Sequence, residues 1–130
     1  MKLFIQGIVL CCAGLSMQSF ALGYSKKFEV CMRSVSNQTE GIKKCQIKEL
    51  KIQNKRVKKL YKYTFKNANP IEKPLVEQMQ SKWYQQRERA CNLTDKKPRN
   101  YTVNHSSCAL QMTLSHADML EVRSGNKVLK

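Results

Sequence analysis

The fold is decided by residues 42–66, "IKKCQIKELKIQNKRVKKLYKYTFK". Apolar residues recur here with the 3.6-residue period of an α-helix, and no proline interrupts the chain before Pro70. One face of the helical wheel is mostly apolar and holds Ile42, Cys45, Leu50, Ile52, Val57, Leu60, Tyr61, Tyr63 and Thr64. The opposite face holds Lys44, Lys48, Lys51, Lys55, Lys58, Lys59, Lys62 and Lys66. The stretch predicts a long amphipathic helix with Thr39 as its N-cap.

Two further helices follow this one. The segment "NANPIEKP" (67–74) predicts a turn, because it contains two prolines and two asparagines. The second helix is expected over residues 74–92 and the third over 107–123, with a polar loop over 94–107. The expected inward residues of these two helices are Leu75, Val76, Met79, Trp83, Ala90, Cys108, Met112, Met119 and Leu120. No strand-like alternation is present, so the sequence predicts an all-α fold, a small antiparallel bundle of about three helices after a short N-terminal segment.

The N-terminal residues are typical of a secretory signal peptide. Lys2 precedes an apolar run over residues 3–15, and the small residues Ser19 and Ala21 follow it. We expect cleavage after Ala21, because Ser19 and Ala21 form a small-residue cleavage site. The apolar run is too short for a membrane span of ~20 residues. The chain would then consist of a signal peptide, 1–21, and one helical domain, 22–130, that is periplasmic or secreted and does not span the membrane.

Two cysteines inside this segment, Cys11 and Cys12, raise the alternative of a lipoprotein. Residues 8–10 are Ile, Val and Leu, whereas a small residue is expected just before a lipidated cysteine. The sequence therefore favours cleavage without lipidation.

The four remaining cysteines predict a disulfide framework. They are Cys31, Cys45, Cys91 and Cys108, an even number in a short exported chain. The local pairs Cys31–Cys45 and Cys91–Cys108 are favoured, since each joins neighbours across a short connection. The pairs Cys45–Cys91 and Cys31–Cys108 are also possible in an antiparallel bundle. The cysteine spacings do not match a zinc site, and we expect neither a metal nor another cofactor.

The stretch "QSKWYQQRERAC" (80–91) holds the only tryptophan of the chain. Trp83 lies on the expected apolar face, with Gln80 and Arg87 one turn away on either side. The segment is therefore interpreted as part of the core, with Cys91 in a disulfide and not a reactive site. A binding hot spot at Trp83 and Arg87 is the alternative, because these residue types are enriched in hot spots. His116 is expected near the inner face of the third helix. No catalytic motif or carboxylate pair is visible, and we expect neither an enzyme nor a small-molecule substrate.

The same motif carries a family resemblance. Gln80, Trp83, Arg87, Glu88 and Cys91 resemble the central Gln-x-x-Trp…Arg-Asp…Cys pattern of the lysozyme inhibitor LprI-like domain, a family of exported bacterial proteins long described only as a domain of unknown function. The flanking matches are Cys45, Val57, Tyr61, Cys108, Thr113 and Leu120. The resemblance covers roughly residues 31–121. Departures from the pattern are Asn54 in place of an acid, Lys58 in place of asparagine and His116 in place of arginine.

Charge suggests what kind of partner the protein binds. The chain carries 24 basic and 9 acidic residues, a net charge of +15, which becomes +14 without Lys2. Ten basic residues and a single acid, Glu49, lie between Lys43 and Lys66. A solvated helix face explains such a run, and so does a site for polyanions such as lipopolysaccharide, teichoic acid, anionic membrane or nucleic acid.

Two functions therefore compete. The resemblance implies a protein that blocks lysozyme or another cell-wall hydrolase, including an immunity role against a peptidoglycan-cutting toxin. The expected inhibitory loop supplies Lys96, Lys97, Arg99, Tyr101 and His105, whose cationic groups could meet the catalytic carboxylates. Animal lysozymes are themselves basic, which opposes association, whereas an acidic toxin would attract the protein. The alternative is an envelope protein that binds a polyanion through the eight-lysine face.

Overall fold

The computed structural model describes residues 23–125, and in this range it contains helices and no strands. The elements are α1 (Lys26–Ser34), α2 (Thr39–Asn67), α3 (Lys73–Ala90), the 3-10 helix η1 (Pro98–Asn100) and α4 (Val103–Arg123). The prediction of an all-α bundle is confirmed, and the N-terminal segment contains a helix of its own, α1. The expected signal peptide, with Ala21 and the cysteines Cys11 and Cys12, lies outside the described residues.

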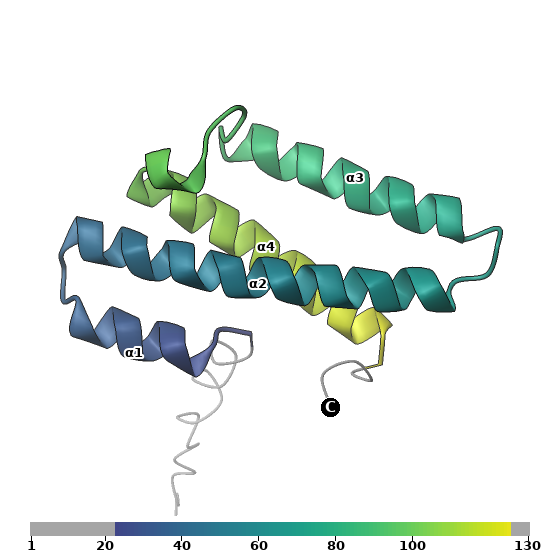
Figure 1. Ribbon diagram of the computed structural model, residues 1–130, viewed down its shortest axis with the longest axis horizontal. Coiled ribbons are helices and arrows are strands. Elements are labelled where there is room, and N and C mark those ends of the chain that lie inside the picture. Colours follow the sequence, from purple (N-terminus) through teal and green to yellow (C-terminus); the bar gives the residue numbers. More distant parts are fainter. Residues whose placement is uncertain (1–22, 126–130) are drawn as a thin grey trace, which may run out of the picture.

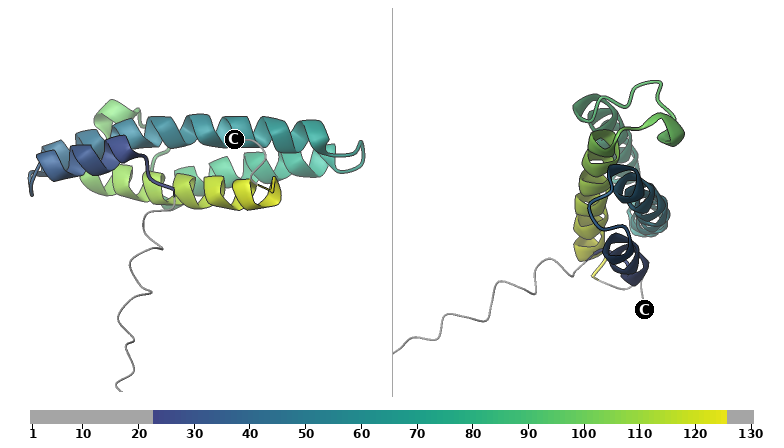
Figure 2. Two further views of the ribbon diagram at one scale, coloured as in Figure 1. Left: turned by 90° about the horizontal axis from the view of Figure 1, so that it is seen from below. Right: turned by 90° about the vertical axis from the view of Figure 1, so that its left-hand side faces the viewer.

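Successive helices run in opposite directions (Figure 1). Helices α2 and α4 therefore run the same way, and they form the most extensive interface of the bundle. Helix α1 packs against the first half of α2, whereas α3 contacts α2 and α4 much more sparsely. Seen from below, the helices form an elongated bundle, and seen end-on the segment between α3 and α4 extends beyond it (Figure 2).

Two disulfides each join one antiparallel helix pair. Cys31 bonds to Cys45 across the α1–α2 turn, and Cys91 bonds to Cys108 across the α3–α4 connection, with sequence separations of 14 and 17. The local pairing predicted from the sequence is confirmed, and the alternative pairing is excluded.

The core consists of two apolar clusters along the α2–α4 interface. The first surrounds Leu50 and Leu110 and includes Leu93 and Tyr101 from the α3–α4 connection. The second contains Val57, Leu60, Ala117 and Leu120, with Met79 and Trp83 of α3 packed against it. Trp83 therefore contacts the core as expected but is only partly buried, whereas Gln80 and Cys91 of the same motif are buried.

Four residues expected to face inward are exposed. They are Ile52, Leu75, Ala90 and Met119. Ile52 lies at the edge of the α2 apolar face, and Leu75 is 63% exposed. For Leu75 and Ala90 the sparse packing of α3 explains the difference, because only part of its apolar side is covered by α2 and α4.

The helix ends also differ from expectation. Gln38 is the N-cap of α2, and Thr39 is its first residue. Helix α3 begins at Lys73 and ends at Ala90, two residues before the expected end. Helix α4 begins at Val103 instead of residue 107, because Thr102 and His105 form a reciprocal capping box at its start.

A buried carboxylate fastens the N-terminal segment to α2. Glu49 is 1% exposed and accepts hydrogen bonds from the Ser25 backbone N–H at 2.8 Å and the Ser25 hydroxyl at 2.5 Å. The Gln53 side-chain amide donates to Glu49 at 2.7 Å and to the Gly23 carbonyl, also at 2.7 Å. Ser25 is at the same time the N-cap of α1. This network sets where the chain enters the bundle.

Candidate functional site

The α3–α4 connection, residues 91–102, is here called the anchored loop. Its base is held by the Cys91–Cys108 disulfide and by the side chains of Leu93 and Tyr101, which are 1% and 7% exposed. Its interior contains successive turns, in which the Lys96 N–H donates to the Leu93 carbonyl at 2.9 Å and the Asn100 N–H donates to the Lys97 carbonyl at 2.8 Å. The loop therefore has a defined backbone conformation and projects from the bundle (Figures 1 and 2).

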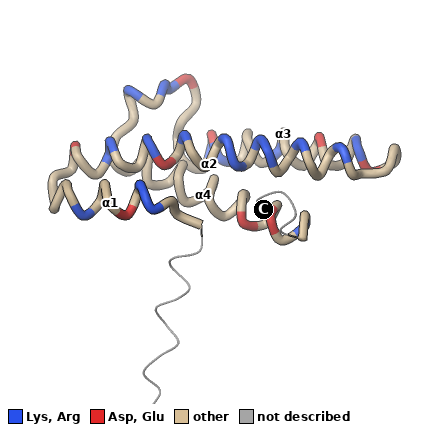
Figure 3. The backbone as a smooth tube through the Cα atoms, turned by 60° about the horizontal axis from the view of Figure 1, so that its bottom comes forward, with Lys and Arg blue, Asp and Glu red and all other residues tan. Residues whose placement is uncertain are grey.

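The backbone of the loop turns sharply at two residues. Asn92 and Asp95 have positive φ angles of 54° and 60°, which asparagine and aspartate tolerate better than most residues. From the first of these turns to the end of η1, the exposed residues include Thr94, Asp95, Lys97, Pro98, Arg99 and Asn100. The tip of the loop therefore presents polar and charged side chains to solvent. Figure 3 shows basic and acidic positions along the backbone of this projecting loop.

The five residues proposed from the sequence for inhibition separate into two groups. Lys97 and Arg99 are exposed at the tip and Lys96 is partly exposed. Tyr101 is buried in the core, where burial raises the pKa of its hydroxyl and the nearby Glu88 carboxylate acts in the same direction. The His105 Nδ1 bonds to Thr102 at the start of α4. The cations are therefore available to a partner, whereas Tyr101 and His105 support the base of the loop.

The tryptophan motif joins three helices beneath the loop. Arg87 donates to Asn54 of α2 and to Thr113 of α4, each at 3.0 Å, and to Glu88 of α3 at 3.1 Å. Its guanidinium also lies 5.1 Å from the centre of the Trp83 ring. Asn54 therefore offers Arg87 an uncharged amide oxygen, and the hydrogen bond between them is charged on the arginine side only.

His116 completes this group from α4. It is 5% exposed, and its Nε2 lies 2.7 Å from the side-chain oxygen of Gln80, which accepts the bond. Burial lowers the pKa of His116 to about 4, and the positive charges of Arg123 and Arg87 act in the same direction. The imidazole is therefore neutral at pH 7 and serves as a core residue, as the sequence suggested. Trp83 and His116 also border a shallow hollow with Met112 and Met119.

The predicted disulfide framework leaves no free thiol among the described residues, since all four cysteines there are bonded. Within residues 23–125 no group of three His, Cys, Asp or Glu side chains is placed to hold a metal ion. No helix in the same range has the length and apolar character needed to span a membrane.

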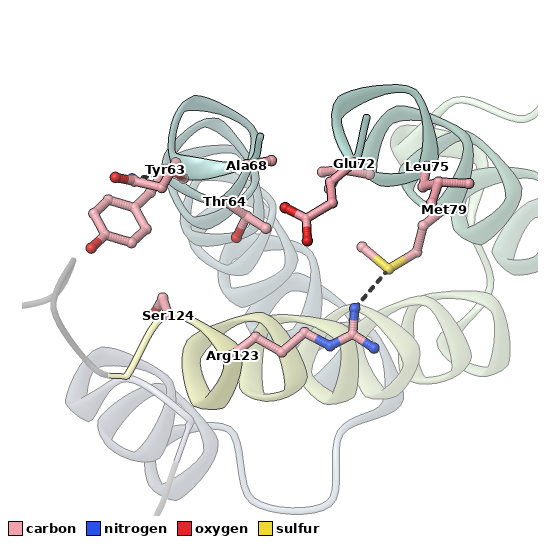
Figure 4. A pocket seen from close by; sticks show the side chains of 10 residues that line it. Tyr63, Thr64, Ala68, Glu72, Leu75, Met79, Arg123 and Ser124 are labelled. Carbon is pink, nitrogen blue, oxygen red and sulfur yellow. Dashed lines mark hydrogen bonds between the residues drawn. The ribbon is translucent and has the colours of Figure 1, made fainter. Parts of the chain in front are cut away.

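A second hollow lies at the far end of the bundle, where α2 ends and α3 begins. It has a volume of about 420 Å³ and is lined by side chains from α2, α3 and α4 (Figure 4). Glu72, the N-cap of α3, and Met79 of α3 line it, and Arg123 of α4 donates to the Met79 sulfur at 3.2 Å. This hollow is separate from the anchored loop, whose residues do not line it.

The eight lysines predicted as one face of α2 are all exposed. We call them the lysine strip; it consists of Lys44, Lys48, Lys51, Lys55, Lys58, Lys59, Lys62 and Lys66. None of them forms an ion pair with a described residue.

The fold and the site define an all-α domain built from two helical hairpins, each closed by its own disulfide, with the anchored loop projecting from the bundle. The family model described as lysozyme inhibitor LprI matches residues 31–120, and the chain belongs to this family. The matched region extends from the first disulfide to the end of the α2–α4 core. No curated protein and no solved structure matches the chain.

Proposed function

We propose that this protein is an exported, non-enzymatic inhibitor that binds lysozyme or a related cell-wall hydrolase through the anchored loop. Membership of the lysozyme inhibitor family supports the class of target. The anchored loop supports the mode of binding, and it is the observation that carries the proposal. A loop already fixed by a disulfide and two buried side chains loses little conformational entropy on binding.

The charge of the loop fits the substrate cleft of a glycoside hydrolase. Such clefts contain a pair of catalytic carboxylates. Lys96, Lys97 and Arg99 bring three positive charges to the tip against the single negative charge of Asp95. Hydrogen bonds between cationic donors and carboxylates are stronger than neutral ones, so a cationic tip gains most from a cleft of this kind.

The net charge of +14 that the chain carries without Lys2 opposes approach to a basic lysozyme and favours an acidic hydrolase. The proposal therefore includes an immunity-type target, a peptidoglycan-cutting enzyme with an acidic surface. With such a target, association should slow as salt is added. With a basic target, salt should speed association by screening the repulsion.

The test is a titration of oxidised residues 22–130 into lysozymes of several types. A small, soluble, uncharged oligosaccharide substrate should be used beside whole peptidoglycan, because coating of an anionic wall by a basic protein also slows lysis. We expect saturable inhibition on both substrates near a one-to-one ratio. The loop variant Lys96→Glu, Lys97→Glu, Arg99→Glu should weaken it at least tenfold.

The matched control is Lys26→Glu, Lys27→Glu, Lys82→Glu, which makes the same charge change at exposed positions on α1 and α3. It should inhibit almost as the unaltered protein does. Inhibition confined to whole peptidoglycan, or equal losses in the two variants, would contradict the proposal.

A further inference from the structure

The lysine strip forms an ordered row of charge. Successive members are one to four positions apart, so their side chains fall within an arc of about 100° on one side of α2. At the helical rise of ~1.5 Å per residue, the row from Lys44 to Lys66 is about 33 Å long. The basic positions that recur along α2 are visible in Figure 3.

The acids of the described chain do not neutralise this row. Glu49 is turned into the interior, where Ser25 and Gln53 bind it. Glu40 pairs with Lys43, outside the strip. Eight like charges on one face repel one another and oppose folding. A partner with a complementary row of negative charge would remove this cost.

The chemistry of the row favours phosphate over bases or lipid. Lysine offers a compact charge without the bidentate geometry of arginine. Single-stranded nucleic acid is bound by bases stacking on exposed aromatic rings, and the rings nearest the row, Tyr61, Tyr63 and Phe65, are half-buried. Insertion into a membrane surface requires a free apolar helix face. That face of α2 is already packed against α4.

The shape of the row favours a flexible chain over a duplex. The strands of a duplex wind around its axis, so a straight row meets each strand only where the strand crosses it. A flexible single chain can lie along the whole row and place charges opposite each ammonium group. We propose that the lysine strip is a binding site for a linear phosphate polymer. This site is independent of the anchored loop and of the proposed inhibition.

The test uses long-chain inorganic polyphosphate and the oxidised protein, with binding measured by calorimetry between 50 and 200 mM salt. For a single-stranded polyanion the slope of log K against log salt is about −0.7 per phosphate contact, so a fully engaged strip gives a slope of about −6. The variant Lys51→Gln, Lys55→Gln, Lys58→Gln should make this slope shallower by about 2 and weaken binding about tenfold or more at 150 mM salt.

The control Lys26→Gln, Lys27→Gln, Lys82→Gln removes the same charge from exposed positions outside the strip, and it should weaken binding less than about threefold. Circular dichroism checks that both variants are folded. Equal losses would show that net charge and not the strip binds the polymer. Tighter binding to duplex DNA or to anionic vesicles, at the same phosphate concentration, would overturn the proposal in favour of that partner. Because no hydrolase is present, the result does not depend on whether the protein inhibits one.

Discussion

The imidazole of His116 lies flat against the indole of Trp83, with ring centroids 4.0 Å apart and ring planes 8° apart. This stack joins α4 to α3, two helices that otherwise touch sparsely. The side-chain oxygen of Gln80 accepts a hydrogen bond from Nε2 of the imidazole, and the Arg87 guanidinium lies over the indole ring. A neutral ring suits this place, because a proton would add a charge to a buried site already close to two arginines.

Acidification should therefore destabilise the fold through His116. Its pKa is lowered from 6.5 to about 4 in the folded state, so between these values the unfolded chain binds more protons. The free energy of unfolding should fall as the pH drops from about 6.5 towards 4, by about 3 kcal/mol at most. Urea unfolding between pH 7 and 5 measures the slope. His116→Gln should be less stable at pH 7 and show a flatter dependence; an unchanged slope would assign the effect to other groups.

Two leucines expected from the sequence to face inward should differ sharply in their energetic importance. Leu60 is fully buried in the α2–α4 interface, whereas Leu75 is 63% exposed on α3. Leu60→Ala should lower the free energy of unfolding by about 2–5 kcal/mol through lost burial and a cavity. Leu75→Ala should change it by less than about 0.5 kcal/mol. Denaturant midpoints compare the two directly, and similar losses would mean that α3 is packed more tightly than described.

The buried carboxylate of Glu49 should be difficult to replace even by its nearest isostere. Glu49→Gln keeps the shape but turns one hydrogen-bond acceptor into a donor facing Ser25 or Gln53. We expect a loss of about 1–3 kcal/mol, together with faster hydrogen exchange in α1. Glu40→Gln is the control on the same helix, since the Glu40 side chain is 67% exposed and its pair with Lys43 should matter little. Equal effects in the two variants would show that the N-terminal anchor is weak.

Removal of the second disulfide should loosen the anchored loop more than the rest of the molecule. Cys91→Ala with Cys108→Ala should cost about 3 kcal/mol, as expected for a crosslink that closes a loop of this length. Hydrogen exchange should accelerate first in residues 91–102. If the protein inhibits as proposed, affinity for the hydrolase should fall even where the bundle remains folded. Full retention of both order and affinity would mean that Leu93 and Tyr101 suffice to hold the loop.

Helical periodicity was enough to predict the long helix α2, its exposed lysines and the all-α class. The short sequence separations favoured the disulfide pairs that the structure contains. Glu49 and Gln53 were not expected in the core because both are polar. Their wheel positions, beside those of Val57 and Leu60, were the available signal. The prediction gave more weight to the polarity of these two side chains than to their wheel positions. In the structure, hydrogen bonds satisfy both side chains in the interior.

The sequence predicted a polar loop over residues 94–107, whereas in the structure the connection ends at Thr102 and α4 begins at Val103. Tyr101 and His105 have the residue types of a binding surface and instead hold the base of the loop. The pair Thr102–His105 has the spacing of a helix cap, which would have placed the start of α4 earlier. The extent to which α3 contacts its neighbours depends on interhelical packing, and no local pattern carries that information.

Each disulfide lies within one helical hairpin, so neither of them crosslinks the two hairpins to each other. One bridge closes the α1–α2 hairpin and the other closes the α3–α4 hairpin, so between Cys45 and Cys91 only the backbone connects them. A single cut at the exposed turn around Pro70 would leave two crosslinked hairpins held together by side-chain packing alone. The two hairpins could therefore be produced separately, oxidised independently and mixed, and their binding constant would measure the packing between them, most of which is the α2–α4 interface.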